Sequence, residues 1–224
     1  MPNRWRTFTR AWTCADIFER RSLVIRLPVA LYKPLVFLLC VAPLGQMIWS
    51  LYSGAFQPNP VEALLHASGD WTLRLLLITL AVTPLKRLTG WRRPVLWRRM
   101  LGLFTFFYAA LHFTIWLWLD RELLWSQILE DLAKRPFITV GFTALLILCA
   151  LAATSNNWSM RRLGAGWQKL HRLVYLAALL GILHYWWLVK ADVREPLIYL
   201  AIYLLLMLLR LPKRALVRRQ GACT

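Results

Sequence analysis

The chain has 224 residues, of which 59% are hydrophobic, and its formal net charge is +18. Several apolar runs approach or exceed the roughly 18 residues of a membrane-spanning helix, so the composition indicates an integral membrane protein and excludes an ordinary soluble domain. The basic residues lie in clusters between these runs and not along one soluble face, which argues against nucleic-acid binding. The 4 cysteines form no CxxC pair and support no disulfide framework, zinc site or iron–sulfur cluster.

Residues 1–28 are polar and Arg-rich, and we expect them to form a basic cytoplasmic tail and not a cleaved signal peptide. The region 29–211 predicts an all-α bundle of six transmembrane helices, followed by a second basic cytoplasmic tail at 212–224. The predicted spans are residues 34–52, 66–85, 100–119, 137–154, 166–189 and 196–211.

The distribution of basic residues predicts the orientation of the bundle. Cytoplasmic loops carry the excess of Lys and Arg, and 22 of the 28 fall on one side of the predicted topology. Both termini are therefore expected in the cytoplasm, with the protein as a multi-pass component of a bacterial inner membrane.

The segment 166–189 carries two histidines, His171 and His184, and an ionisable side chain within an apolar span is a functional-site hypothesis. Their 13-residue separation corresponds to roughly 20 Å along one helix, but it leaves the side chains roughly 140° apart around the axis. Either the helix is locally over- or underwound, for which Gly181 or a π-bulge offers a cause, or the two histidines face different partner helices.

His184 and His112 are expected at a similar depth in the membrane. Each lies roughly 18–21 Å outward from the basic end of its own helix. Neutral imidazole is a common ligand of metals and of haem iron, so two histidines at one depth on neighbouring helices could clamp a porphyrin from its two faces. The alternative is a pair of histidines that are hydrogen-bonded within the core of the bundle.

Three further residues are candidates for the same chemistry. His171 lies at the inner membrane boundary, where it is either a ligand or a solvated interfacial residue. His66, at the outer start of the second span, could bind a second centre, donate to a porphyrin carboxylate, or have no role. Arg74 within that span requires an anion or an outward-reaching conformation, and haem propionates would supply the anion.

Four segments and two His-containing dipeptides carry a resemblance to a known family, MsrQ, within the ferric-reductase-like transmembrane superfamily. The matching motifs are LLHASGDW (64–71), VTPLKRL (82–88), RRMLGL (98–103) with LH at 111–112, and GAGWQKLHRLVYLA (164–177) followed by HY at 184. Members of this family are haem-binding membrane subunits of periplasmic methionine sulfoxide reductase systems.

The resemblance implies one or two b-type haems with ligands at His112, His171 and His184, and it allows for bound FMN. It implies electron transfer from quinol or a cytosolic flavin reductase to a periplasmic molybdopterin-containing methionine sulfoxide reductase, in support of protein repair. The chain would then be an electron-transfer subunit and not the catalytic one. Alternatives are a stand-alone ferric or quinol-dependent reductase, a proton-coupled transporter, or a structural protein.

The outer segments carry 7 of the 10 acidic residues, including Glu122, Glu130 and Asp131. Because charged rims steer transient redox partners, we expect the partner to dock on this acidic surface.

Overall fold

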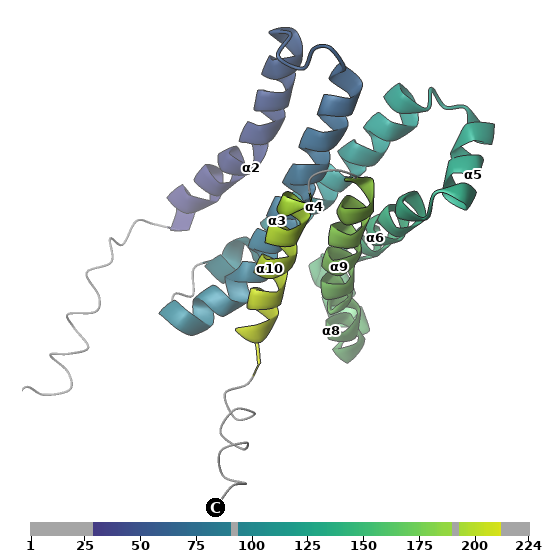
Figure 1. Cartoon of the computed structure of the whole chain (residues 1–224). Helices are drawn as coiled ribbons and strands as arrows, with labels where there is room; N and C mark the ends of the chain where they lie inside the picture. Colours follow the sequence, from purple (N-terminus) through teal and green to yellow (C-terminus); the bar gives the residue numbers. More distant parts are fainter. Residues whose placement is uncertain (1–28, 91–93, 190–192, 212–224) are drawn as a thin grey trace, which may run out of the picture. The chain divides into compact units, whose positions relative to one another are not determined.

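The computed structural model describes residues 29–90, 94–189 and 193–211, which are largely helical and contain no β-strand (Figure 1). The chain divides into two units, residues 1–36 and 37–224. Only residues 29–36 of the first unit are described, and they begin helix α2 (Val29–Tyr52). The two predicted tails, 1–28 and 212–224, lie outside the described residues.

Two long helices of the second unit, α3 (Pro60–Thr89) and α4 (Pro94–Ile115), precede α6 (Pro136–Ala153). Both α3 and α6 begin with proline, whose missing N–H costs nothing in the first turn. The Asn59 side chain accepts a hydrogen bond from the Glu62 backbone N–H at the start of α3. Gly90 ends this helix at a φ of +70°, a left-handed conformation that glycine adopts readily.

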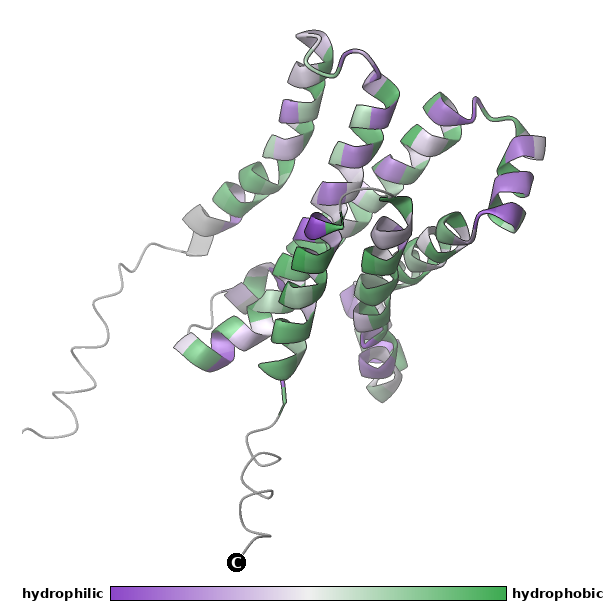
Figure 2. Ribbon diagram, viewed as in Figure 1, coloured by the Kyte–Doolittle hydropathy of each residue, from purple (hydrophilic) through white to green (hydrophobic). Residues whose placement is uncertain are grey.

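Within the described residues, three helical segments are long and apolar enough to cross a membrane, namely Lys33–Tyr52, Leu96–Asp120 and Pro136–Ala153. The apolar helices α9 (Leu173–Leu188) and α10 (Arg194–Leu208) are shorter, and hydrophobic residues dominate both of them (Figure 2). The all-α membrane class is therefore confirmed, whereas the number of spans stays a prediction.

The helix predicted over 166–189 is present with one irregular turn. After α7 (Asn157–Leu163), α8 (Ala165–His171) and α9 are separated by Arg172 alone, which keeps helical φ and ψ values of −71° and −20°. A π-helical turn lies at Trp116–Asp120, where it extends α4. The polar segment 120–136 contains a further helix that the sequence reading did not predict, α5 (Trp125–Lys134).

The buried core lies where α3, α9 and α10 meet. Leu80 of α3 and Ala178 of α9 are fully buried. Small residues such as alanine let helix backbones approach closely, which is a common basis of packing between apolar helices. The core thereby fixes α9 against α3 and sets the position of the histidine near the end of α9.

A buried tyrosine links the second half of α2 to α4. Tyr108 is fully buried, donates a hydrogen bond to the Cys40 carbonyl at 2.8 Å and accepts one from the Leu44 N–H at 3.1 Å. Both polar functions of its hydroxyl are satisfied, as a buried polar group requires.

Candidate functional site

A cavity of about 510 Å³ lies among α3, α4, α6 and α9, near the end of the bundle that α5 occupies. Its wall is mainly apolar, and its volume is in the range of sites that hold organic ligands. Its titratable lining residues, besides Tyr185, are Glu62, His66, Asp70, His112, Asp120, Arg121, Arg135 and His184.

His112 reaches this cavity from α4 and is anchored on α3. Its Nδ1 lies 3.0 Å from the Leu65 carbonyl oxygen and 3.2 Å from the Ser68 hydroxyl. Because a carbonyl oxygen can only accept, Nδ1 carries the hydrogen and Nε2 holds the free lone pair.

His184 reaches the cavity from α9 and is anchored on α6 in the same way. Its Nδ1 lies 2.7 Å from the Phe137 carbonyl oxygen, which leaves Nε2 with the lone pair. Among the described residues, Nε2 of neither imidazole has a hydrogen-bond partner. Both rings therefore present a metal-binding nitrogen, oriented by a backbone bond at the opposite nitrogen.

Each anchoring carbonyl lies four residues before a glycine that the same imidazole packs against. A Cβ added at Gly69 would lie 3.3 Å from Cε1 of His112, and one added at Gly141 would lie 2.7 Å from Nδ1 of His184. In an α-helix the carbonyl at position i is bonded to the N–H at i+4, so the missing side chain at i+4 exposes that carbonyl to a neighbouring ring. The two histidines thus occupy equivalent sites on α3 and α6.

The two rings lie close together, as the depth argument predicted. Their centroids are 6.3 Å apart and their planes are nearly perpendicular, at 86°. Two metal–nitrogen bonds of roughly 2.0–2.1 Å, plus roughly 1 Å from each nitrogen to its ring centre, require roughly 6 Å between centroids. The observed separation would allow both imidazoles to bind one metal ion.

His171 lies apart from the cavity, at the other end of α6. Its ring stacks on Trp167 with centroids 4.0 Å apart, and its Nε2 lies 3.2 Å from the Thr154 hydroxyl.

Both histidines of the 166–189 segment contact α6, one at each end. Around Arg172 the hydrogen bonding of the helix changes: the Arg172 N–H lies 3.2 Å from both the Gln168 and Lys169 carbonyl oxygens, and the Tyr175 N–H donates to the Arg172 carbonyl, three residues earlier. This irregular turn agrees with the first explanation considered from the sequence, a helix that is locally over- or underwound, although it lies at Arg172 and not at Gly181.

His66 lines the cavity near its edge and lies 3.9 Å from Glu62, one turn earlier in α3. Arg74 is absent from the lining. Its Nη2 lies 3.4 Å from the Asp70 carboxylate, and its Nε donates to the Tyr199 hydroxyl at 3.0 Å. The anion beside Arg74 is thus Asp70, and a role for this arginine at a propionate stays a prediction.

The structure identifies site residues that the sequence reading missed. Arg121 and Arg135 line the cavity, and Asp131 lies between them. Asp131 is only 7% exposed, so its assignment to an acidic docking surface is wrong. Gly69 and Gly141 could not be recognised as site residues from the sequence. The four-residue spacing between each glycine and its anchoring carbonyl matters only where a histidine of another helix packs against it.

These features are those of a haem-binding class of membrane protein. The family model described as ferric reductase like transmembrane component matches residues 68–182 of this chain, a range that includes His112 and all of α6. Two relatives are named protein-methionine-sulfoxide reductase heme-binding subunit MsrQ. The one from Xanthomonas campestris pv. campestris (strain B100) is 51% identical over 196 residues, covering 85% of this chain and 90% of the relative. The one from Bordetella pertussis is 50% identical over 192 residues, covering 85% and 92%. The chain belongs to the MsrQ family.

Proposed function

We propose that this chain is a haem b subunit that carries electrons across the membrane, with His112 and His184 as the two axial ligands of one haem. The observation that carries the proposal is the pairing of two backbone-anchored imidazoles whose centroids are 6.3 Å apart in one cavity. The relatives' name, heme-binding subunit, supports the same cofactor.

The residues present fit a haem better than a bare metal ion. Among the described residues, no group of three or more His, Cys, Asp or Glu side chains could hold a metal ion. Two imidazoles fill two coordination positions, and a porphyrin supplies four more. When bound, the haem iron would supply one-electron redox chemistry. The chain orients each imidazole through the hydrogen bond at its Nδ1. It also supplies an apolar cavity wall that excludes water and two glycines against which the imidazole rings pack.

The absorption spectrum of the purified protein, oxidised and then reduced, tests this proposal. The wild type should show a low-spin haem, and His112→Gly and His184→Gly should each lose that signal. Added imidazole should restore it in part, because a free ligand can occupy the vacated space only if the rest of the site has folded. Retention of a full low-spin signal in both variants would refute the axial pairing.

A second redox contact is proposed at His171, either as ligand of a second haem or at the site of electron entry from quinol or FMN. Its separation from the cavity, with its ring stacked on Trp167 at the other end of α6, supports this role. His171→Ala should slow reduction by the donor while leaving the low-spin signal of the His112–His184 haem intact. An unchanged reduction rate would leave His171 as a structural residue.

The topology is part of the proposal: six spans over 29–211, cytoplasmic tails at 1–28 and 212–224, and residence in the bacterial inner membrane. The location of 22 of the 28 Lys and Arg residues on one side supports it. The α5 end of the bundle is then the periplasmic end. Reporter fusions after residues 56 and 224 should report opposite sides of the membrane, and identical sides would refute the orientation.

The partner would be a periplasmic molybdopterin-containing methionine sulfoxide reductase, and the donor a quinol or a cytosolic flavin reductase. The family match also favours a second candidate, a stand-alone ferric reductase. Reduced protein that transfers electrons to the periplasmic enzyme, but not to ferric chelates, would support the first. The reverse result would support the second.

A further inference from the structure

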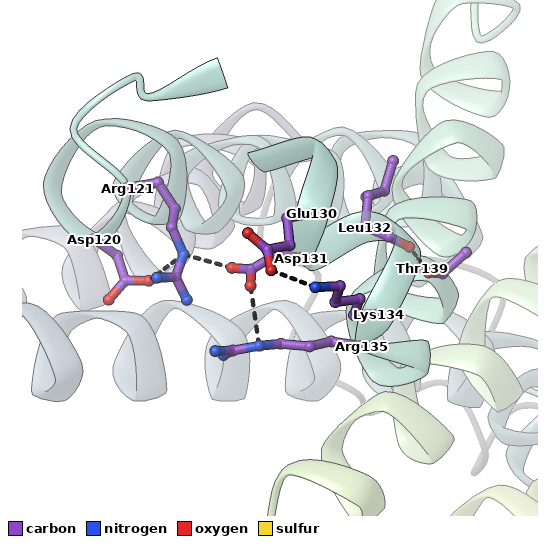
Figure 3. A network of polar contacts seen from close by, with 8 residues as sticks. All are labelled: Asp120, Arg121, Glu130, Asp131, Leu132, Lys134, Arg135 and Thr139. Carbon is purple, nitrogen blue, oxygen red and sulfur yellow. Dashed lines mark hydrogen bonds and ion pairs between the residues drawn. The ribbon is translucent and has the colours of Figure 1, made fainter. Parts of the chain in front are cut away.

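A carboxylate on α5 holds two arginines that border the cavity. Asp131 Oδ2 lies 2.7 Å from Arg121 Nε, and its Oδ1 lies 3.0 Å from Arg135 Nε (Figure 3). Arg121 follows the π-helical turn that ends α4, and Arg135 directly precedes α6. One side chain of α5 thus connects the ends of the two helices between which α5 lies.

Burial of the Asp131 carboxylate is energetically unfavourable unless cations pair with it. The residue is 7% exposed, and a buried carboxylate is stable only when it is paired. The connection from the π-helical turn to α5 also passes through Glu122 and Leu123, at φ values of +48° and +58°. Left-handed non-glycine residues persist where surrounding contacts enforce them and are concentrated at functional sites.

Asp131 forms an ion pair with the Nε edge of each guanidinium. Arg121 Nε also lies 3.3 Å from Asp120 Oδ2, and among the described residues no hydrogen bond involves Nη1 or Nη2 of Arg121 or Arg135. Both arginines also line the cavity that contains His112 and His184. A guanidinium has five N–H donors in a fixed plane and can bind one carboxylate at each edge.

We propose that Arg121 and Arg135 bind the two propionate carboxylates of the cofactor through their terminal amino groups, while Asp131 orients both guanidinium planes from the opposite edge. This inference rests on the proposed function, because it requires a haem in the cavity. Arg121 contributes more than Arg135, since their side chains are 20% and 50% exposed and water screens the more exposed pair.

The test uses the full chain, purified in detergent without haem, and two probes: protohaem and its dimethyl ester. The ester keeps the iron and the ring but has no carboxylate charge. The wild type should bind protohaem roughly tenfold or more tightly than the ester, as charge-assisted hydrogen bonds allow. Arg121→Gln should reduce this preference to within about threefold, with a smaller reduction for Arg135→Gln.

Comparing two probes in the same variant separates propionate binding from general damage to the fold, which would weaken both probes alike. Lys134→Gln is the matched control, because Lys134 is 73% exposed, pairs with Glu130 and neighbours Arg135 without lining the cavity. Arg121→Lys, which keeps the charge but loses the second edge, should give an intermediate preference.

The outcomes separate this inference from the proposed function. A wild type that binds both probes through His112 and His184, but whose preference for protohaem is the same in Arg121→Gln and Lys134→Gln, overturns the arginine assignment alone. A wild type that binds neither probe overturns the haem proposal and this inference with it. Loss of preference in the arginine variants, with the low-spin spectrum retained, supports both.

Discussion

Gly141→Ala is the substitution that the site should tolerate least for its size. An added Cβ would lie 2.7 Å from Nδ1, 2.9 Å from Cε1 and 3.1 Å from Cγ of His184. Ordinary carbon contacts begin near 3.5 Å, so the ring must withdraw by roughly 0.7 Å or more. That movement also breaks the 2.7 Å hydrogen bond from Nδ1 to the Phe137 carbonyl.

The expected loss of stability combines two unfavourable contributions and one favourable contribution. Overpacking a filled site costs about 1–3 kcal/mol, and loss of a buried hydrogen bond costs about 1–3 kcal/mol. Replacing a mid-helix glycine by alanine returns about 0.5–1 kcal/mol of helix stability. The net loss is about 1–5.5 kcal/mol, and because it falls on a proposed ligand it should appear as about a fivefold or greater weakening of haem binding.

Two matched variants give a graded series. A Cβ at Gly69 would lie 3.3 Å from Cε1 of His112, a contact that a few tenths of an ångström relieve, so Gly69→Ala should weaken haem binding only a few-fold. A Cβ at Gly102, also in a helix, meets nothing within 4 Å, so Gly102→Ala should leave binding unchanged and stabilise the fold slightly. Haem titration of the three variants is the assay. Equal affinity in Gly141→Ala and Gly102→Ala would refute the packing argument.

Three further predictions concern polar contacts. Ser68→Ala should weaken haem binding by less than about tenfold, because His112 keeps its bond to the Leu65 carbonyl; a larger loss in a haem titration would show that the hydroxyl is the main anchor. Tyr108→Phe should lower the free energy of unfolding by about 1–3 kcal/mol without changing the haem spectrum, since the lost bonds are remote from the cavity; denaturant titration measures it, and no loss would contradict their role in fixing α2. Thr154→Val should slow reduction by the donor to the same degree as loss of the neighbouring imidazole, and stopped-flow rates equal to wild type would refute that dependence.

The helical class and the pairing of His112 with His184 could be predicted from the sequence, because hydropathy and rise per residue fix approximate depth. The irregular turn at Arg172 could not, since an apolar run predicts a helix without revealing where its hydrogen-bond pattern changes. The helix at 125–134 was missed because its charged residues make it resemble a loop, although Ile128 and Asp131 are buried on one face.

The roles of charged residues were the least predictable. Asp131 reads as a solvent-exposed acid in the sequence, and only the fold brings Arg121 to it. Arg135 stands four residues after Asp131, and Arg74 stands four residues after Asp70, so both of these pairs have the i,i+4 spacing of neighbours on one helix face. The pairing of Asp131 with Arg121 depends on how α5 packs, which apolar periodicity does not specify.

Because the acceptors for Nδ1 of His112 and His184 are main-chain oxygens, no side-chain substitution at Leu65 or Phe137 deletes them. An alanine scan would record these two positions only through packing, and any residue type there supplies the same oxygen. The orientation of both proposed ligands therefore depends on the helix backbone and not on which side chains occupy positions 65 and 137. Removing it requires a change to the backbone itself, such as an amide-to-ester replacement, or a bulky residue four positions onward.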